Sequence, residues 1–326
     1  MSKSARPVAE KGPAPRMQES GRAQSELARP ELAQSELAQS ELALGGHRFG
    51  QARLLVMAIV NRTPDSFFRP GLTWDEPAAM ELVHQVVAEG ADIIDVGGVP
   101  AAPGQDVPIA EEVRRTAGFI AWVREAYPEI VISVDTWRHE VARQACAAGA
   151  DLINDSWGGW DPELPAVVAE AGAGLVCSHT GGQQPRTRPH RVRYDDVMAD
   201  VLGHTQWLAS RAVAAGVDPA RIVVDPAHDF GKNTWHSLEV TRRLAELTAA
   251  RWPVLISVSR KDFIGESLNL PLPDRLVGTL TTTTICAWLG ARIFRAHDVV
   301  STRQALDMVS AIRGDAPPAR AVRGLA

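Results

Sequence analysis

The sequence predicts an eight-stranded parallel α/β barrel, the (β/α)8 or TIM barrel fold. From about residue 51 onward, short apolar runs typical of buried strands alternate with longer segments whose apolar residues recur at helical spacing. Eight such units follow one another, and a chain of 326 residues is long enough to close them into one barrel. A doubly wound open sheet is the alternative that the same alternation allows.

The boundaries of these elements can be read from the apolar periodicity and from the turn residues between segments. We expect strands at residues 54–60, 92–96, 130–134, 152–153, 174–177, 222–224, 254–257 and 292–294. We expect helices at residues 77–89, 110–126, 139–148, 162–171, 195–215, 237–250, 273–289 and 302–312. Five helices are followed by a glycine, which is typical of a left-handed helix stop: Gly90, Gly149, Gly172, Gly216 and Gly290.

The first strand shows how each unit is built. Its residues from Leu55 to Val60 are all apolar, as expected for a strand that is buried on both faces. Asn61, Thr63 and Asp65 follow, and Pro64 disfavours a helix at this point. The apolar run therefore ends in a polar loop, and the same order recurs in the units downstream.

Polar residues follow every expected strand. In a barrel of this kind the chemistry lies where the strands end, so these residues should meet at one rim. An Asp or Asn after a strand can instead cap the next helix; that role is favoured for Asp155 and Thr136 and disfavoured for Asp135 and Asp225, which follow long apolar runs. The expected rim residues are Asn61, Asp65, Asp95, Gly97, Gly98, Asp135, Thr136, Asn154, Asp155, Ser178, His179, Asp225, His228, Asp229, Lys232, Ser259, Arg260, Lys261, Arg295, His297 and Asp298.

Residues 1–46 differ in composition from the rest of the chain. The stretch 25–44 repeats a five-residue unit, SELAR-PELAQ-SELAQ-SELAL. A period of five places the leucines all around a helix, so the segment cannot bury a continuous apolar face. We expect a disordered N-terminal extension at 1–46 and the barrel domain at 47–326, with a short partner-binding helix as the alternative for the repeat.

The overall charge does not favour a nucleic-acid or membrane partner. The net charge is −5 and the isoelectric point is about 6.0, so there is no global basic field. Cys146, Cys177 and Cys286 are widely spaced in apolar segments, which favours buried free thiols over a metal site. Residues 1–50 contain no signal-peptide core and the chain has no long uncharged apolar run. We therefore expect a cytoplasmic protein.

The expected floor of the barrel suits a planar heterocycle with adjacent N–H donors. Carboxylates such as Asp135 and Asp225 can accept two parallel hydrogen bonds from such an edge, for example that of a 2-aminopyrimidinone. Asn154 adds a donor and an acceptor, and Lys261 can hold a carbonyl or a ring nitrogen on the far side. The sequence therefore indicates a nitrogen-rich heterocyclic ligand.

The expected rim suits a phosphate group. Asn61, Arg295 and His297 would favour a phosphate or diphosphate, with Mg²⁺ sharing its charge. A heterocycle on the barrel floor and a diphosphate at the rim together imply a reaction in which the diphosphate departs as an anionic leaving group.

Eight motifs resemble those of the dihydropteroate synthase family, in the same order and spacing, between about residues 54 and 300. They are NRTPDSF, DIIDVGG, ISVDT, LINDSWGG, VDPAHDFGKN, SRKDFIG, RLVGTL and FRAHDV. The resemblance implies an α/β barrel that condenses hydroxymethyl-dihydropterin diphosphate with 4-aminobenzoate in folate synthesis. It also implies a homodimer through the end of the barrel that includes Trp288 and residues 299–311; a shell helix packing on its own barrel would show the same apolar pattern.

By position, the resemblance assigns roles to seven residues. Asp135, Asn154, Asp225 and Lys261 would hold the pterin, and Asp135, Asp225 and Lys261 would form the catalytic set. Asn61, Arg295 and His297 would hold the diphosphate, with Asn61 also a ligand of Mg²⁺. Departure of diphosphate would leave a pterin-stabilised carbocation that the amine captures, and electrostatic stabilisation of the leaving group would supply most of the rate.

Three departures from the family's pattern lie on the amine side of the expected site. After the second strand the chain reads GGVPAAPG, where the family typically reads GGESTRPG. Asp262 stands where a Ser is usual, either as an ordinary first-turn residue of a helix or as a charge that repels an incoming carboxylate. The segment 178–185 replaces Met-His-Met and a short loop, and the basic run RTRPHRVR at 186–193 follows as a solvated loop or a second anion site.

Two further differences lie beside the expected pterin position. His228 and Asp229 replace part of a Gly-rich segment and add bulk and charge there. His179 is either a satisfied rim histidine or a replacement acid-base group, and the sequence leaves both roles open.

Residues assigned to pterin and diphosphate persist in this chain, whereas those assigned to aminobenzoate do not. This pattern resembles the divergent second synthase homologue of mycobacteria and related actinobacteria. We hypothesise a protein that binds a pterin diphosphate and whose 4-aminobenzoate condensing activity is weak or lost. The alternatives are a fully active dihydropteroate synthase and a non-catalytic pterin-binding or scaffold protein. A methyltransferase using methyl-tetrahydrofolate ranks lower, because nothing in the chain resembles a corrinoid domain.

Overall fold

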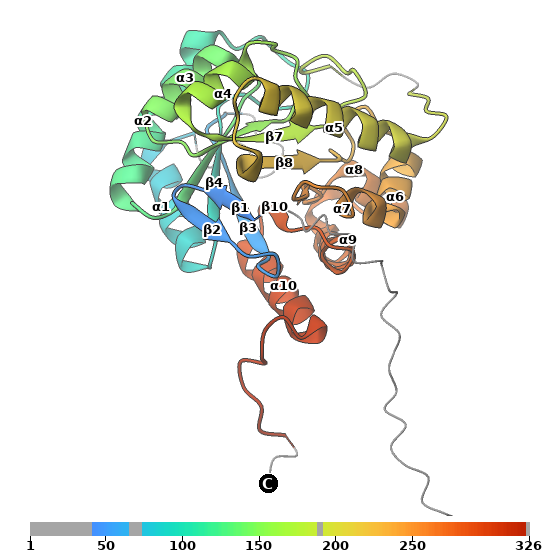
Figure 1. Ribbon diagram of the computed structural model, residues 1–326. Helices are drawn as coiled ribbons and strands as arrows, with labels where there is room; N and C mark the ends of the chain where they lie inside the picture. Colours follow the sequence, from blue (N-terminus) through green and yellow to red (C-terminus); the bar gives the residue numbers. More distant parts are fainter. Residues whose placement is uncertain (1–40, 65–73, 188–191, 324–326) are drawn as a thin grey trace, which may run out of the picture. The chain divides into compact units, whose positions relative to one another are not determined.

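Eight parallel strands form the sheet at the centre of the protein (Figure 1). The computed structural model describes residues 41–64, 74–187 and 192–323. The sheet order is β8-β7-β6-β5-β4-β3-β10-β9, and a parallel bridge between Val224 and Val254 joins its two outer strands, so the barrel closes. The strands are β3 (Leu55–Asn61), β4 (Ile93–Gly97), β5 (Val131–Asp135), β6 (Leu152–Asp155), β7 (Gly174–Ser178), β8 (Ile222–Asp225), β9 (Leu255–Ile256) and β10 (Ile293–Ala296). The predicted fold class and all eight strands are confirmed.

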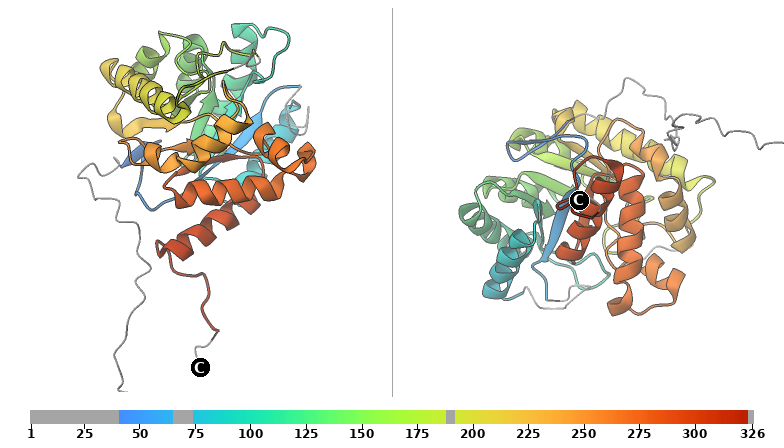
Figure 2. Two further views of the ribbon diagram at one scale, coloured as in Figure 1. Left: turned by 90° about the vertical axis from the view of Figure 1, so that its right-hand side faces the viewer. Right: turned by 90° about the horizontal axis from the view of Figure 1, so that it is seen from below.

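Ten α-helices lie in the described residues and surround the strands (Figure 2). They are α1 (Glu76–Ala88), α2 (Ile109–Ala126), α3 (His139–Ala147), α4 (Leu164–Ala171), α5 (Val197–Ala214), α6 (Thr234–Arg242), α7 (Leu244–Thr248), α8 (Asp262–Leu268), α9 (Leu276–Trp288) and α10 (Val299–Arg313), with 3-10 turns η1 (Pro219–Arg221) and η2 (Leu272–Asp274). All five glycines expected at helix stops have positive φ. None of the helices in the described part of the chain combines the length and the apolar composition that a membrane span requires.

Two helical details differ from the prediction. The helix expected at 237–250 is broken at Arg243 into α6 and α7, and α6 begins earlier because Asn233 and His236 cap it reciprocally. Helix α8 is missing from the expected helices, because its seven residues are too few to show a helical period, although the first-turn role considered for Asp262 implied a helix start there. The helix ends at Asn269 in the left-handed conformation.

The apolar side chains of the strands alternate between two layers. Leu55, Met57, Ile93 and Ile293 point into the barrel and form part of its interior core. Their neighbours along each strand pack outward against the helices. This alternation is the expected filling of an eight-stranded barrel, which is a packed core and not a pore.

A short antiparallel hairpin supplies part of the interior core. It consists of β1 (Leu42–Leu44) and β2 (His47–Phe49), and the side chains of Leu42 and Leu44 are buried among the inward residues of the strands. Arg292 donates hydrogen bonds of 2.8 Å to the carbonyls of Phe49 and Gly50, which ties the hairpin to the start of β10. The strand β1 thus begins inside the range that the sequence assigns to the tail. The rest of the predicted tail, residues 1–40, lies outside the described residues.

The three cysteines are free thiols, as expected. Cys177 and Cys286 are buried and Cys146 is half-buried. Burial raises the pKa of the Cys146 thiol to about 11, so it is not a reactive thiolate at neutral pH.

Shortening Leu44 should destabilise the barrel. Leu44→Ala leaves a cavity in the interior core, and we expect the free energy of unfolding to fall by about 2–5 kcal/mol in urea denaturation. The control is Arg48→Ala on the same hairpin, where the exposed side chain should contribute less than about 0.5 kcal/mol. Equal losses for the two variants would show that the hairpin does not belong to the folded core.

Candidate functional site

A cavity of 790 Å³ opens at the carboxyl ends of the barrel strands. Residues that follow seven of the eight strands, and the apolar stretch Val99–Pro103 after β4, line it. All seven predicted site residues are among its lining residues: Asn61, Asp135, Asn154, Asp225, Lys261, Arg295 and His297. Asp65, which was also expected at this rim, lies outside the described residues.

The floor of the cavity is organised by a buried guanidinium. Arg295 on β10 donates from Nε to Asp95 at 2.6 Å and from Nη2 to Asp135 at 2.8 Å. Asp95 is fully buried and also accepts hydrogen bonds from the Ser133 hydroxyl and the Asn154 amide, at 2.6 and 3.3 Å. Asp95 was expected at the rim but not assigned a role in the site. Its alternation with Ile93 and Gly97 on β4 is the signal that its side chain points into the barrel.

Asp135 is a carboxylate of the cavity floor whose pKa lies well above its ordinary value. Burial raises its pKa to about 6, against the opposing effect of the Arg295 charge and of the hydrogen bond from Ser156, which is 2.8 Å long. The carboxylate therefore changes charge within the neutral range, which is a common property of functional carboxylates.

Asp225 and Lys261 face the cavity from β8 and from the loop after β9. Asp225 Oδ1 accepts the backbone N–H of Ala227 at 2.7 Å, and burial raises the pKa of this carboxyl. The Lys261 ammonium donates to the carbonyl of His228 and lies 4.8 Å from the centre of the Phe230 ring. Burial lowers the pKa of Lys261, while Asp229 and Asp225 oppose that change. The charges of Asp225 and Lys261 attract each other, which partly opposes the effect of burial on both pKa values.

The loop after β8 is held in an unusual backbone conformation. Ala227 and Asp229 both have positive φ, at 48° and 67°. The Lys232 ammonium lies inside the loop, 3.1 to 3.2 Å from the carbonyls of Phe230 and Ala227 and 3.0 Å from that of His179. Burial lowers the pKa of Lys232 to about 7. This lysine ties the loop after β8 to the loop after β7.

His179 is fully buried and both of its ring nitrogens are engaged. Nδ1 lies 2.7 Å from the Lys232 ammonium, and Nε2 lies 2.6 Å from the carboxylate of Asp200 on α5. Burial lowers the pKa of His179 to about 3. The sequence left two roles open for His179. The structure supports the first, a buried histidine whose two ring nitrogens both have hydrogen-bond partners.

His228 and Asp229 differ in their positions. The His228 ring is buried against Phe263, with centroids 5.5 Å apart, and its Nε2 lies 3.0 Å from the Thr241 hydroxyl. It therefore adds no bulk to the cavity, although its backbone carbonyl holds Lys261. Asp229 does line the cavity and accepts hydrogen bonds from Phe263 N–H and the Ser237 hydroxyl.

The helix-cap role expected for Asp155 and Thr136 is wrong, because the N-cap residues of α4 and α3 are Glu163 and Arg138 and no side chain caps either helix. Asp155 accepts the backbone N–H groups of Trp157 and Gly159 at 3.1 and 2.7 Å. The Thr136 hydroxyl accepts from Arg138 N–H and donates to Glu112. Both residues hold local turns at the barrel rim.

The upper part of the cavity contains the oxygen donors that Mg²⁺ would need. Asn61 ends β3, and Thr63 follows with a buried hydroxyl for which the described residues provide no hydrogen-bond partner. Mg²⁺ commonly takes one or two protein oxygens and completes its shell with water and phosphate oxygens. The side chains of Asn61 and Thr63 fit that requirement. His297 follows β10, the strand that pairs with β3, and its backbone N–H donates to the Ser259 hydroxyl.

The mouth of the cavity carries the departures seen in the sequence. Asp262 is the first residue of α8 and forms an ion pair of 2.8 Å with Arg275, while its side chain is 69% exposed. It thus serves as a first-turn acid and also lines the cavity. In the basic run, Arg186 donates to the carbonyls of Ala102 and Gln105. Arg188 and Arg191 lie outside the described residues, and Arg193 is exposed.

A second polar cluster, His139, Glu140 and Asp161, could in principle hold a cation. Asp161 Oδ2 accepts both the backbone N–H and the ring Nδ1 of His139 at 2.9 Å, at the first residue of α3. A carboxylate at a helix N-terminus is stabilised by the exposed N–H groups, so these contacts account for the cluster without a metal.

A closed eight-stranded α/β barrel with a polar cavity at the carboxyl ends of its strands defines the class of small-molecule-binding barrel proteins. A family model described as "Pterin binding enzyme" matches residues 57–297. The chain belongs to this pterin-binding family, as one of the dihydropteroate synthases and their homologues.

Relatives carry two different names. The chain is 56% identical over 287 residues to "Inactive dihydropteroate synthase 2" of Mycobacterium leprae, which covers 87% of this chain and 99% of that protein. It is 36% identical to "Dihydropteroate synthase" of Escherichia coli, over 78% of this chain and 90% of the relative. A crystal structure of the Yersinia pestis dihydropteroate synthase with a sulfonamide drug complex has a TM-score of 0.80, with 32% identity over 85% of this chain and 100% of that chain.

The carboxyl of Asp135 should titrate at about pH 6. Because its pKa in the folded protein lies above the unfolded value, its contribution to stability is fully present below the unfolded pKa and is lost as the pH rises through 6. A carbon-detected NMR titration of the carboxyl measures this pKa directly. Arg295→Met should raise it further by removing the opposing charge, and Ser156→Ala should raise it less. A carboxyl that titrates below pH 4.5 in the unmodified protein would contradict this description of the floor.

Proposed function

We propose that the cavity binds a pterin diphosphate together with Mg²⁺, and that condensation of this ligand with 4-aminobenzoate is weak or lost. The observation that carries the proposal is the convergence of Asp135, Asn154, Asp225 and Lys261 on one cavity floor. These groups come from four different units of the barrel and present the acceptors and donors that a 2-aminopyrimidinone edge requires.

The pterin would lie on the floor, between the carboxylates and Lys261. Asp225 has one oxygen occupied by Ala227 N–H, and its second oxygen can accept N–H groups of the ligand. Asn154 is oriented by Asp95, which accepts from its amide nitrogen and so turns its carbonyl oxygen away. The Lys261 ammonium can exchange the His228 carbonyl for a ligand oxygen or ring nitrogen. This arrangement would orient the ring and make Asp135, Asp225 and Lys261 the candidate catalytic groups.

The diphosphate would lie above the ring, between Asn61 and His297. Mg²⁺ bound there would neutralise the diphosphate and stabilise it as a leaving group. Arg295 is paired with Asp95 and Asp135, and its guanidinium would reach the ligand from the floor side of that position. The cavity also holds the acids Asp229, Asp262 and Glu266, so the bound cation is needed to offset the charge of an anionic ligand.

The amine side supports weak or lost condensation. The wall from Val99 to Pro103 offers apolar side chains and no cation to a carboxylate ligand. Asp262 adds a negative charge at the mouth, which its ion pair with Arg275 reduces but does not remove. Relatives named as inactive agree with this reading. Full activity is the second candidate, favoured by the intact floor and by the relatives named as synthases.

Calorimetric titration with 6-hydroxymethyl-7,8-dihydropterin diphosphate and Mg²⁺ tests the proposal. We expect saturable binding that Asp225→Asn weakens by about 10- to 100-fold, because a ligand N–H pair loses its ionic acceptor. Asp262→Asn is the matched control, since it removes one carboxylate charge from the mouth and should not weaken pterin binding. Turnover after addition of 4-aminobenzoate at ordinary enzyme rates would favour the second candidate, and absence of binding would rule out both.

We also propose a homodimer through α9 and α10. These helices expose large apolar side chains that a monomer would leave in water: Val277, Ile285, Trp288, Met308 and Ile312. Two copies of such a face can bury each other around a two-fold axis.

A charge within this face should separate the copies. We expect Trp288→Glu to shift the protein from dimer to monomer in sedimentation velocity, because a carboxylate in an apolar contact must be desolvated. Trp207→Glu on α5 is the control, since Trp207 is exposed to a similar extent and lies beside Arg211, outside α9 and α10. A monomeric unmodified protein would contradict the dimer.

A further inference from the structure

The described residues that line the cavity include more acids than bases. The acids are Asp135, Asp225, Asp229, Asp262 and Glu266, and the bases are Lys232, Lys261 and Arg295, with His297 as a further titratable group. Each base already has partners within the chain, because Arg295 pairs with two carboxylates and both ammonium groups lie against backbone carbonyls. The cavity therefore has an excess of acidic groups before any ligand binds.

Two of these acids lie side by side at the mouth. Asp262 is the first residue of α8 and Glu266 follows one turn later, so both side chains project from the same face of the helix. Both are exposed, and both line the cavity. Glu266 accepts a hydrogen bond from the hydroxyl of Thr234, which is a neutral donor and does not offset its charge.

The cation that pairs with Asp262 is not available to a ligand. Arg275 makes this ion pair at 2.8 Å, and its guanidinium also donates to the carbonyls of Arg260 and Leu270, at 3.0 and 3.2 Å. The guanidinium packs against Gly265, where a Cβ atom would collide with it. Arg275 does not line the cavity. It thus reduces the charge of Asp262 without presenting a positive group to the ligand.

Backbone donors at the start of α8 are also taken. The Phe263 N–H donates to Asp229 Oδ2 at 3.2 Å, and the next two N–H groups donate to the carbonyl of Lys261, at 3.2 and 3.3 Å. A carboxylate of the chain therefore occupies the place where an anionic ligand could meet the helix start. Burial raises the pKa of Asp229 against the charge of Lys261, and the nearby acid Asp262 adds to that rise. A further anion here would add to this repulsion.

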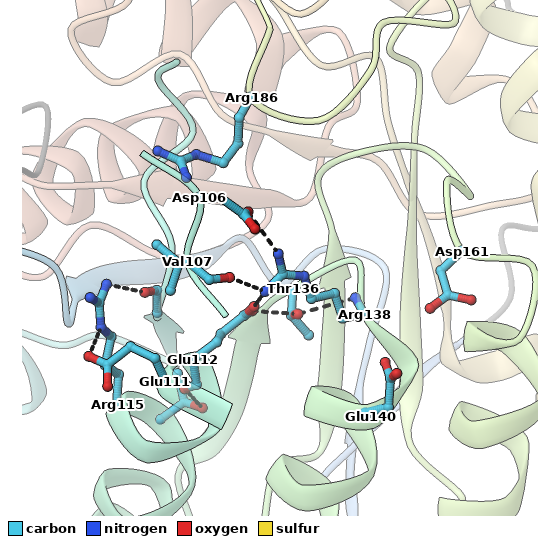
Figure 3. Close-up of polar contacts among 12 residues, drawn as sticks. Asp106, Val107, Glu111, Glu112, Arg115, Thr136, Arg138, Glu140, Asp161 and Arg186 are labelled. Atoms are coloured by element: carbon cyan, nitrogen blue, oxygen red, sulfur yellow. Dashed lines mark hydrogen bonds and ion pairs between the residues drawn. The ribbon is translucent and has the colours of Figure 1, made fainter. Parts of the chain in front are cut away.

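Three arginines border the loop between β4 and α2, which carries the apolar wall of the cavity at residues 99–103. Arg115 pairs with Glu111 at 2.7 Å, and Arg138 pairs with Glu112 at 2.9 Å (Figure 3). Arg186 donates to two backbone carbonyls of the loop. None of the three arginines lines the cavity. The wall therefore faces the cavity with apolar side chains and without a cation.

We propose that the second ligand of this cavity is an organic cation, with its charge against Asp262 and Glu266 and its hydrocarbon part against Val99–Pro103. The acids attract the charge, and the wall buries the hydrocarbon part without desolvating a polar group. A carboxylate ligand meets the same two acids and finds the first helix donors occupied. The inference rests on the proposed function in one respect, because a bound pterin diphosphate adds negative charge to the cavity and strengthens the preference for a cation.

Three probes of nearly the same shape test the charge of the second ligand. 4-Aminobenzamidine is a cation, 4-aminobenzamide is neutral and 4-aminobenzoate is an anion. In calorimetric titrations of the full chain, loaded with 6-hydroxymethyl-7,8-dihydropterin diphosphate and Mg²⁺, we expect affinity to fall in this order. The cation should bind about tenfold more tightly than the anion, the factor for two partly screened charge contacts. Added salt should reduce this ratio.

Substitutions of the two acids locate the bound cation. We expect Glu266→Gln and Asp262→Asn each to weaken 4-aminobenzamidine about threefold and to leave 4-aminobenzamide unchanged, because each removes one charge and little volume. Glu170→Gln is the matched control, since Glu170 is also an exposed acid but lies on α4, where it pairs with Arg143. Equal losses in Glu266→Gln and Glu170→Gln would contradict a cation site at the mouth.

The outcomes separate the cation site from the proposed function. If 4-aminobenzoate binds as tightly as 4-aminobenzamidine, or if the cation does not bind, the cation site is wrong, while pterin binding still supports the proposed function. If the pterin does not bind, the proposed function fails, and the three probes are titrated against the free protein. A cation preference there that Glu266→Gln reduces supports the cation site, whereas the absence of such a preference rejects it.

Discussion

The ion pairs of Arg295 with Asp95 and Asp135 are the constraint on which the rest of the site depends. A buried guanidinium between two carboxylates is costly to desolvate and contributes little to stability, so its value lies in the geometry that it imposes. It fixes two acids from neighbouring strands, opposes the effect of burial on Asp135, and through Asp95 sets the orientation of Asn154. The placement of Asp95, Asp135 and Asn154 on the floor follows from this one contact.

The walls of the cavity are held in place by weaker and more exposed contacts than its floor. Floor groups are held by strands and by buried hydrogen bonds, whereas the mouth is formed by loops with exposed contacts, such as the pair Asp262–Arg275 and the hydrogen bonds of Arg186. Loops change at little cost to the barrel. A family member can therefore keep a ligand-binding floor while its second-ligand side diverges, which is the combination that we propose for this protein.

The predictions from sequence succeeded where the signal is local. All eight strands, the glycine stops and the burial of Cys177 and Cys286 were foreseen, because periodicity and turn chemistry act over a few residues, whereas Cys146 is only half-buried. The seven site residues do line one cavity, although their roles toward pterin and diphosphate stay predictions. The errors were also local in origin: α8 is too short to show a period, and the break at Arg243 lies inside a continuous apolar pattern. The contribution of Leu42 and Leu44 to the core was hidden by the repeat around them.

The sequence by itself determined the barrel and the set of polar residues at its rim. Both can be recognised from residues that are close together in the chain, namely the apolar residues of each strand and the polar residues that follow it. Only the tertiary structure decided which of those residues pair. Arg295 and Asp95 lie 200 positions apart, and Arg186 and Ala102 lie 84 apart. Contacts at such separations depend on how the barrel closes and on which loops lie side by side. For the same reason, only the tertiary structure showed that both ring nitrogens of His179 have hydrogen-bond partners and that Arg186 donates to the loop after β4.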